Sequence, residues 1–198
     1  MLPSEIVPGL LRWTARHPAW DGETSWGPMV GCVLYEVGGT VVLIDPLLPA
    51  EGREAFLLWL DHRVDGRPVS VLTTIHWHAR DRDEVAERYR ANSSRVWNFV
   101  PPGVQSKPLR GAGETLFWLP DVATLVPGDR LLGAPDGGLQ LCPEDWLSSV
   151  RVDRLGLAGL IRPLIELPIE RVLVSHGEPV LEDGRAALAQ ALHEVDGL

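Results

Sequence analysis

Cysteine is scarce in this sequence. The 198 residues include two cysteines, Cys32 and Cys142, which lie far apart in the chain. A disulfide framework or a thiolate zinc site needs more cysteines at closer spacing. We therefore expect both thiols to be reduced and buried as small apolar side chains. This scarcity excludes the disulfide-rich secreted domains and the zinc-finger class.

Long apolar runs are also absent. No stretch reaches the roughly eighteen apolar residues that a membrane-spanning helix needs, so we expect no membrane association. The first residues, "MLPSEIVPGLLRWTARHPAWDGE", lack the basic start and apolar block of a signal peptide. The sequence therefore predicts a cytoplasmic protein.

Positive charge is the third shortage. Lysine and arginine total 18 against 27 aspartate and glutamate residues, which gives a formal net charge of −9. No basic block offsets the repulsion that a nucleic-acid backbone would experience. We therefore expect no nucleic-acid partner and favour a small-molecule substrate.

Strands and helices alternate along the chain without a repeat, a low-complexity tract or a break in composition. We therefore expect a single domain over residues 1–198. Apolar spacing over 51–64 predicts a helix with Ala55, Leu58, Trp59 and His62 on one face. Strands are predicted over 32–37, 40–44, 68–75, 93–100, 114–120, 121–129 and 169–176, and further helices over 82–92, 154–167 and 181–195.

Polar residues gather where the predicted strands end. Asp45, His76, His78, Asp129 and His176 each stand at or just past the carboxyl end of a strand. Proteins that combine strands and helices commonly build their sites at such strand ends. The spacing therefore predicts that these five residues contribute to one site.

The segment "HWH" offers two imidazoles. On an extended backbone, residues i and i+2 face the same side, so His76 and His78 could bind one ion while Trp77 points away. Together with Asp129 they form a donor set that suits Zn²⁺, and also Fe²⁺ or Mn²⁺. The alternative is a polar strand end that binds no metal.

The order of these motifs resembles the metallo-β-lactamase-fold superfamily over most of the chain. "VVLID", "HWHARD", "LVPGDRL" and "VLVSHGEP" stand where the superfamily has a strand ending in Asp, HxHxDH, a strand ending in Gly-Asp, and a final His-Gly. The resemblance implies an α/β (α+β) fold, the four-layer αββα sandwich of the metallo-β-lactamase type. Its two halves are expected to meet near residues 95–115.

The resemblance also implies roles for individual residues. His76 and His78 would bind a first ion, Asp129 would be the bridging carboxylate, and His176 would be a ligand of a second ion. Asp45 would orient the histidine loop through hydrogen bonds. A turn residue before Pro46 is the alternative for Asp45.

The sequence departs from the superfamily pattern at three places. Arg80 and Asp81 stand at the closing Asp and His of HxHxDH, and the later loop "LRGAGETLFW" has no histidine. Glu114 is the nearest residue to that loop that could coordinate a metal. A guanidinium repels a nearby divalent ion, so Arg80 could instead neutralise Asp129 or Asp81 in place of a second ion.

Each of these substitutes also has an ordinary interpretation. Arg80 could be a solvent-facing residue before a helix. Asp81, with Glu84 three residues later, fits a helix N-cap with a reciprocal partner. Glu114 could be an exposed turn carboxylate.

Two functions remain open. The first is a hydrolase of small esters, thioesters or lactones, with one divalent ion, zinc before iron or manganese, and with Asp129 holding the metal-bound water. Arg80 would contribute its charge to this site. The second is an inactive protein of the same fold without a metal, which binds a small anionic ligand or a protein partner through Arg80.

Overall fold

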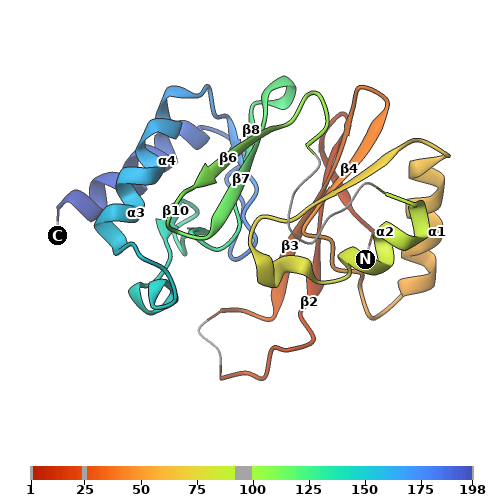
Figure 1. Ribbon diagram of the computed structural model, residues 1–198, viewed down its shortest axis with the longest axis horizontal. Coiled ribbons are helices and arrows are strands. Elements are labelled where there is room, and N and C mark those ends of the chain that lie inside the picture. Colours follow the sequence, from red (N-terminus) through yellow and green to blue (C-terminus); the bar gives the residue numbers. More distant parts are fainter. Residues whose placement is uncertain (1, 24–25, 92–99, 198) are drawn as a thin grey trace. The chain divides into compact units, whose positions relative to one another are not determined.

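The computed structural model describes residues 2–23, 26–91 and 100–197 (Figure 1). The chain divides into two compact units: the first unit comprises Met1–Thr73 and Trp77–Val104, and the second comprises Thr74–His76 and Gln105–Leu198. The chain passes from the first unit to the second for the last time after Val104. This point lies within residues 95–115, where the two halves were expected to meet. The predicted strand over 93–100 lies almost wholly outside the described residues.

The first unit contains a five-stranded sheet. Its strands in spatial order are β1 (Ser4–Val7), β2 (Leu10–Arg16), β3 (Met29–Val37), β4 (Thr40–Ile44) and β5 (Val69–Leu72). Neighbours pair antiparallel except β4 and β5, which are parallel. Gly38 and Gly39, both with positive φ, form the tight turn of the predicted β3–β4 hairpin. Strands β1 and β2 were not predicted.

Helices α1 (Arg53–Val64) and α2 (Arg82–Tyr89) pack on one face of this sheet. The buried stripe of α1 is Phe56, Leu60 and Val64, and Phe56 packs against Trp13 with ring centroids 5.4 Å apart. The predicted stripe was wrong, because Leu58 is 56% exposed. Spacing of i, i+4 and i+8 also describes the stripe that begins at Phe56, and packing against the sheet selects it.

The second unit contains two sheets and two helices. A four-stranded sheet has the order β11 (Arg171–Val172), β8 (Thr124–Val126), β7 (Glu114–Leu119) and β6 (Gln105–Leu109), and β9 (Leu131–Gly133) pairs with β10 (Leu139–Leu141). Only β11 and β8 are parallel. Helices α3 (Arg154–Ile161) and α4 (Gly184–Asp196) share a second apolar core with these strands.

Three predicted elements of the second unit are shorter than expected. The strand predicted over 121–129 is limited to β8. The ladder of the final strand is limited to β11, and the helix predicted over 154–167 gives way to a 3₁₀ turn at Arg162–Glu166. Pro163 lies at the start of that turn and has no N–H to continue the helix. None of the helices within the described ranges combines the length and apolar character needed to cross a bilayer.

Each unit thus contains one pair of parallel neighbouring strands, β4 with β5 and β8 with β11. Parallel neighbours present their carboxyl ends at the same edge of the sheet. Side chains that follow the two strands of a pair can therefore meet. This topology positions the two polar clusters described next.

Candidate functional site

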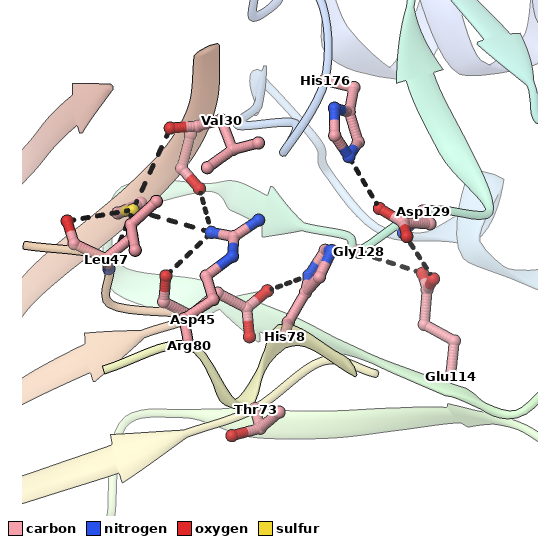
Figure 2. A network of polar contacts seen from close by, with 12 residues as sticks. Val30, Asp45, Leu47, Thr73, His78, Arg80, Glu114, Gly128, Asp129 and His176 are labelled. Atoms are coloured by element: carbon pink, nitrogen blue, oxygen red, sulfur yellow. Dashed lines mark hydrogen bonds and ion pairs between the residues drawn. The ribbon is translucent and has the colours of Figure 1, made fainter. Parts of the chain in front are cut away.

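The first unit brings His78 and Asp45 together. His78 follows β5, Asp45 follows β4, and His78 Nδ1 lies 2.8 Å from Asp45 Oδ2 (Figure 2). Both side chains are buried, with exposed fractions of 3% for each residue. A carboxylate that accepts the Nδ1 proton fixes the tautomer and leaves Nε2 available to a ligand. This is the hydrogen bond that the resemblance implies for Asp45.

The "HWH" segment is not extended. His76–Ala79 forms a 3₁₀ segment that is kinked at His78, where φ is −82° and ψ is 18°, far from the angles of a strand. His76 is exposed whereas His78 is buried. The expectation that both imidazoles share one face of a strand was therefore wrong, because the chain leaves the extended conformation after β5 to reach α2. The role of His76 as a metal ligand stays a prediction.

Arg80 is tied to the main chain of the first unit. Its Nη1 donates to the carbonyl oxygens of Gly31 (3.0 Å) and Asp45 (2.9 Å) and lies 3.6 Å from Cys32 Sγ (Figure 2). The residue has a φ of 41°, in the left-handed region. The solvent-facing interpretation was wrong: the guanidinium links β3 to the end of β4.

Asp81 stands at the N-cap position of α2, as expected, yet makes no capping hydrogen bond. Its Oδ2 instead accepts from the backbone N–H of Leu48 at 2.6 Å. Glu84, its predicted reciprocal partner, pairs with Arg53, whose Nη1 also lies 3.8 Å from Asp81. The predicted capping box was wrong, because a main-chain donor beyond β4 lies within reach of the carboxylate.

The second unit brings Asp129 and His176 together. These residues follow β8 and β11, and His176 Nε2 lies 3.3 Å from Asp129 Oδ1 (Figure 2). Two ligands at about 2.0–2.2 Å from one tetrahedral ion are about 3.3–3.6 Å apart. The separation of the two atoms is therefore compatible with coordination of one ion by both side chains.

Two residues that sequence analysis missed adjoin this pair. The Trp146 ring packs edge-on against His176, with centroids 5.8 Å apart. Arg130 is fully buried, and its guanidinium donates to the carbonyl oxygens of Ala112 (2.9 Å) and Trp146 (3.0 Å). Nothing in the sequence around Arg130 indicates that its side chain is buried. Trp146 lies in a turn that is distant in sequence from both Asp129 and His176.

Glu114 begins β7 and is buried, with an exposed fraction of 4%. Both of its carboxylate oxygens accept main-chain N–H groups of the loop that contains Asp129. The exposed-turn interpretation was therefore wrong. Burial, and next the negative charge of Asp129, raise the pKa of Glu114 to about 7, against the opposite effect of the three N–H donors.

No protein-family model and no curated protein matches the sequence. Solved structures do match it over nearly the whole chain. A metallo-β-lactamase from Erythrobacter litoralis is 16% identical, with 99% of this chain and 96% of that chain covered and a TM-score of 0.65.

Two further solved structures give the same result. A metallo-β-lactamase from Pontibacter korlensis is 15% identical, with 96% of this chain and 98% of that chain covered and a TM-score of 0.61. A metallo-β-lactamase family protein from Thermus thermophilus is 15% identical, with coverages of 97% and 81% and a TM-score of 0.54. The chain has the metallo-β-lactamase fold, so the predicted fold class, an α+β sandwich of this type, is confirmed.

Proposed function

We propose that the protein is a metal-dependent hydrolase that uses one divalent ion. The observation that carries this proposal is the Asp129–His176 pair, whose ligand atoms lie 3.3 Å apart after two parallel strands. The order of the sequence motifs suggests His78 as the third ligand, and the contact of its Nδ1 with Asp45 leaves Nε2 available. Two imidazoles and one carboxylate suit zinc and leave a coordination position for water. His76 is left out of this set because its side chain is exposed.

Each of these residues would have a defined part in the reaction. A bound ion would lower the pKa of its water toward neutrality and polarise a carbonyl oxygen. Asp129 would orient that water and accept its hydrogen bond. Asp45 holds His78 in the tautomer that coordinates, and Trp146 limits the rotation of the His176 ring. Small esters, thioesters or lactones are the substrates that this chemistry serves best.

Arg80 restricts the site to one ion. It replaces the carboxylate that the superfamily uses for a second ion, and its guanidinium stays protonated. The hydrogen bonds to the Gly31 and Asp45 carbonyls hold this charge near the His78–Asp45 pair. A second divalent ion beside this cation would be repelled, and the guanidinium supplies its charge instead.

The test is metal stoichiometry on protein purified without chelator and then dialysed against Zn²⁺, Mn²⁺ or Fe²⁺. At most one ion per chain is expected by elemental analysis. His78→Ala and His176→Ala, one in each unit, should each weaken zinc binding by more than the 10–100-fold typical of changes around a ligand. His62→Ala and His193→Ala remove exposed histidines of the same two units and should leave binding unchanged.

Two results would contradict this proposal in different ways. Two ions per chain in the native protein would overturn the role given to Arg80. If only one of the two histidine variants lost zinc binding, the ligands of the ion would all belong to one unit. With one ion bound, hydrolysis of a panel of thioesters and lactones then defines the substrate class.

A second candidate function is a protein of this fold that binds an anion or a partner without catalysis. The presence of Arg80 in place of a ligand favours it. This candidate predicts no bound ion after reconstitution with any of the three metals. It also predicts no hydrolysis of the panel, so the same experiment distinguishes it from the hydrolase.

A further inference from the structure

The carboxylate of Glu114 is surrounded by three consecutive main-chain donors. Oε1 accepts from Gly128 N at 3.0 Å, and Oε2 accepts from Asp129 N at 2.7 Å (Figure 2). Oε2 also accepts from Arg130 N at 2.9 Å. Successive N–H groups that converge on one point form a concave anion-binding site in the backbone. Here the bound anion is a side chain of the same protein, and it is buried.

The loop is shaped around this carboxylate. A Cβ atom at Gly128 would lie 2.5 Å from Thr74 Oγ1 and 2.9 Å from Glu114 Oε2. No side chain other than hydrogen fits at Gly128 without moving these groups. The glycine of the Gly-Asp pair therefore lets the Glu114 carboxylate approach the main chain.

The main chain of Glu114 makes a second connection. Glu114 forms an antiparallel bridge with Ile75, and Thr115 N donates to Thr74 O at 2.8 Å. Ile75 directly precedes His76 in the second unit. One residue therefore joins the segment that enters the histidine turn to the loop that carries Asp129.

We propose that Glu114 is a positioning residue, a buried carboxyl group whose three accepted hydrogen bonds set the conformation of the Gly128–Arg130 loop and so aim the Asp129 carboxylate at His176. When the carboxyl group is ionised, these hydrogen bonds are charge-assisted and roughly twice as strong as neutral ones, so they constrain the loop effectively. The expected loss of metal affinity rests on the proposed function, whereas the expected change in the Gly128–Arg130 loop does not.

The experiment compares wild type with Glu114→Gln and Glu114→Ala by ¹H–¹⁵N NMR. The amide protons of Gly128, Asp129 and Arg130 should be downfield in wild type and should move upfield in both variants. The carboxamide of Glu114→Gln has a single acceptor oxygen, so it cannot satisfy all three donors. Formate added to Glu114→Ala should restore the shifts. Glu182→Ala, which removes an exposed glutamate of the same unit, is the control and should show no change with or without formate.

Zinc titration supplies the second readout. Glu114→Ala should bind zinc about 10–100-fold more weakly than wild type, and formate or Glu114→Asp should recover part of the loss. Unchanged amide shifts in a folded Glu114→Gln protein would overturn the inference. If the shifts move but wild type binds no zinc, the proposed function fails while the positioning of the loop stands.

Discussion

Two glycines of the second unit allow the His176 loop to lie directly against β9. A Cβ atom at Gly133 would lie 2.3 Å from the carbonyl oxygen of Glu178, and one at Gly177 would lie 2.6 Å from the carbonyl oxygen of Gly133. Gly133 N donates to His176 O at 2.9 Å across this contact. This close contact between two main-chain segments therefore fixes the position of the His176 loop against β9.

Gly133→Ala should destabilise the protein by about 1–3 kcal/mol, because the added methyl group has no space and the His176 loop must move. Gly159→Ala is the matched control: a Cβ there meets nothing within 4 Å, and the position lies inside α3. That change should stabilise the protein by about 0.5–1 kcal/mol through helix propensity. Urea unfolding of both variants gives the comparison, and equal effects of the two substitutions would disprove the packing argument.

Among the secondary-structure elements, α1 and α2 are joined by one polar cluster. Asp61 of α1 accepts from Arg88 through both carboxylate oxygens and from the Tyr89 hydroxyl, both of α2. These hydrogen bonds, with Arg88 first, hold the pKa of Asp61 below its ordinary value. A carboxyl with a lowered pKa in the folded state adds stability above its unfolded pKa, and this stability is lost as the pH falls through the folded pKa.

Asp61→Asn should therefore be less stable than wild type at neutral pH, by up to about 1 kcal/mol because the pair is partly exposed to solvent. The difference should shrink as the pH falls from about 4 through the lowered pKa of the folded carboxyl, below which the wild-type carboxyl is also neutral. Urea midpoints measured from pH 7 down to the acid range test this. Glu54→Gln removes an exposed charge from the same helix and should show no such convergence, and a constant deficit for Asp61→Asn would exclude the ion pair as its cause.

At the scale of the whole molecule, each unit has its own apolar core and one thiol within it. Cys32 belongs to the core beneath α1 and α2, and Cys142 to the core beneath α3 and α4. Both are free and buried, as the sequence predicted. Burial, the largest cause in each case, raises the pKa of each thiol to about 11.

At about pH 8 roughly a thousandth of each folded thiol is ionised, so reaction with a disulfide reagent should be slow until the chain unfolds. Two thiols per chain should then react in guanidinium chloride without reductant. Cys142→Ser leaves a reporter for the first unit and Cys32→Ser one for the second. Rapid labelling of either variant in native buffer would show that its unit opens readily, contrary to this expectation.

The sequence determined which residues stand where strands end. Asp45, His78, Asp129 and His176 were located from apolar runs, turn residues and the order of motifs, because hydrophobic periodicity and turn chemistry act over a few neighbouring residues. The same local information identified α1, α4 and the β3–β4 hairpin. The fold class came from the resemblance of the motif order to a known superfamily.

The groups that the polar side chains bind depend on contacts between segments that are distant in the sequence. Arg80 donates to carbonyls of β3 and β4, Asp81 accepts from Leu48, and Glu114 accepts from the Gly128–Arg130 loop. Each partner is at least fourteen residues away in sequence. Parallel pairing of β4 with β5 and antiparallel pairing of β7 with β8 create these proximities, and a side chain bonds to whichever donor or acceptor the fold places within about 3 Å of it.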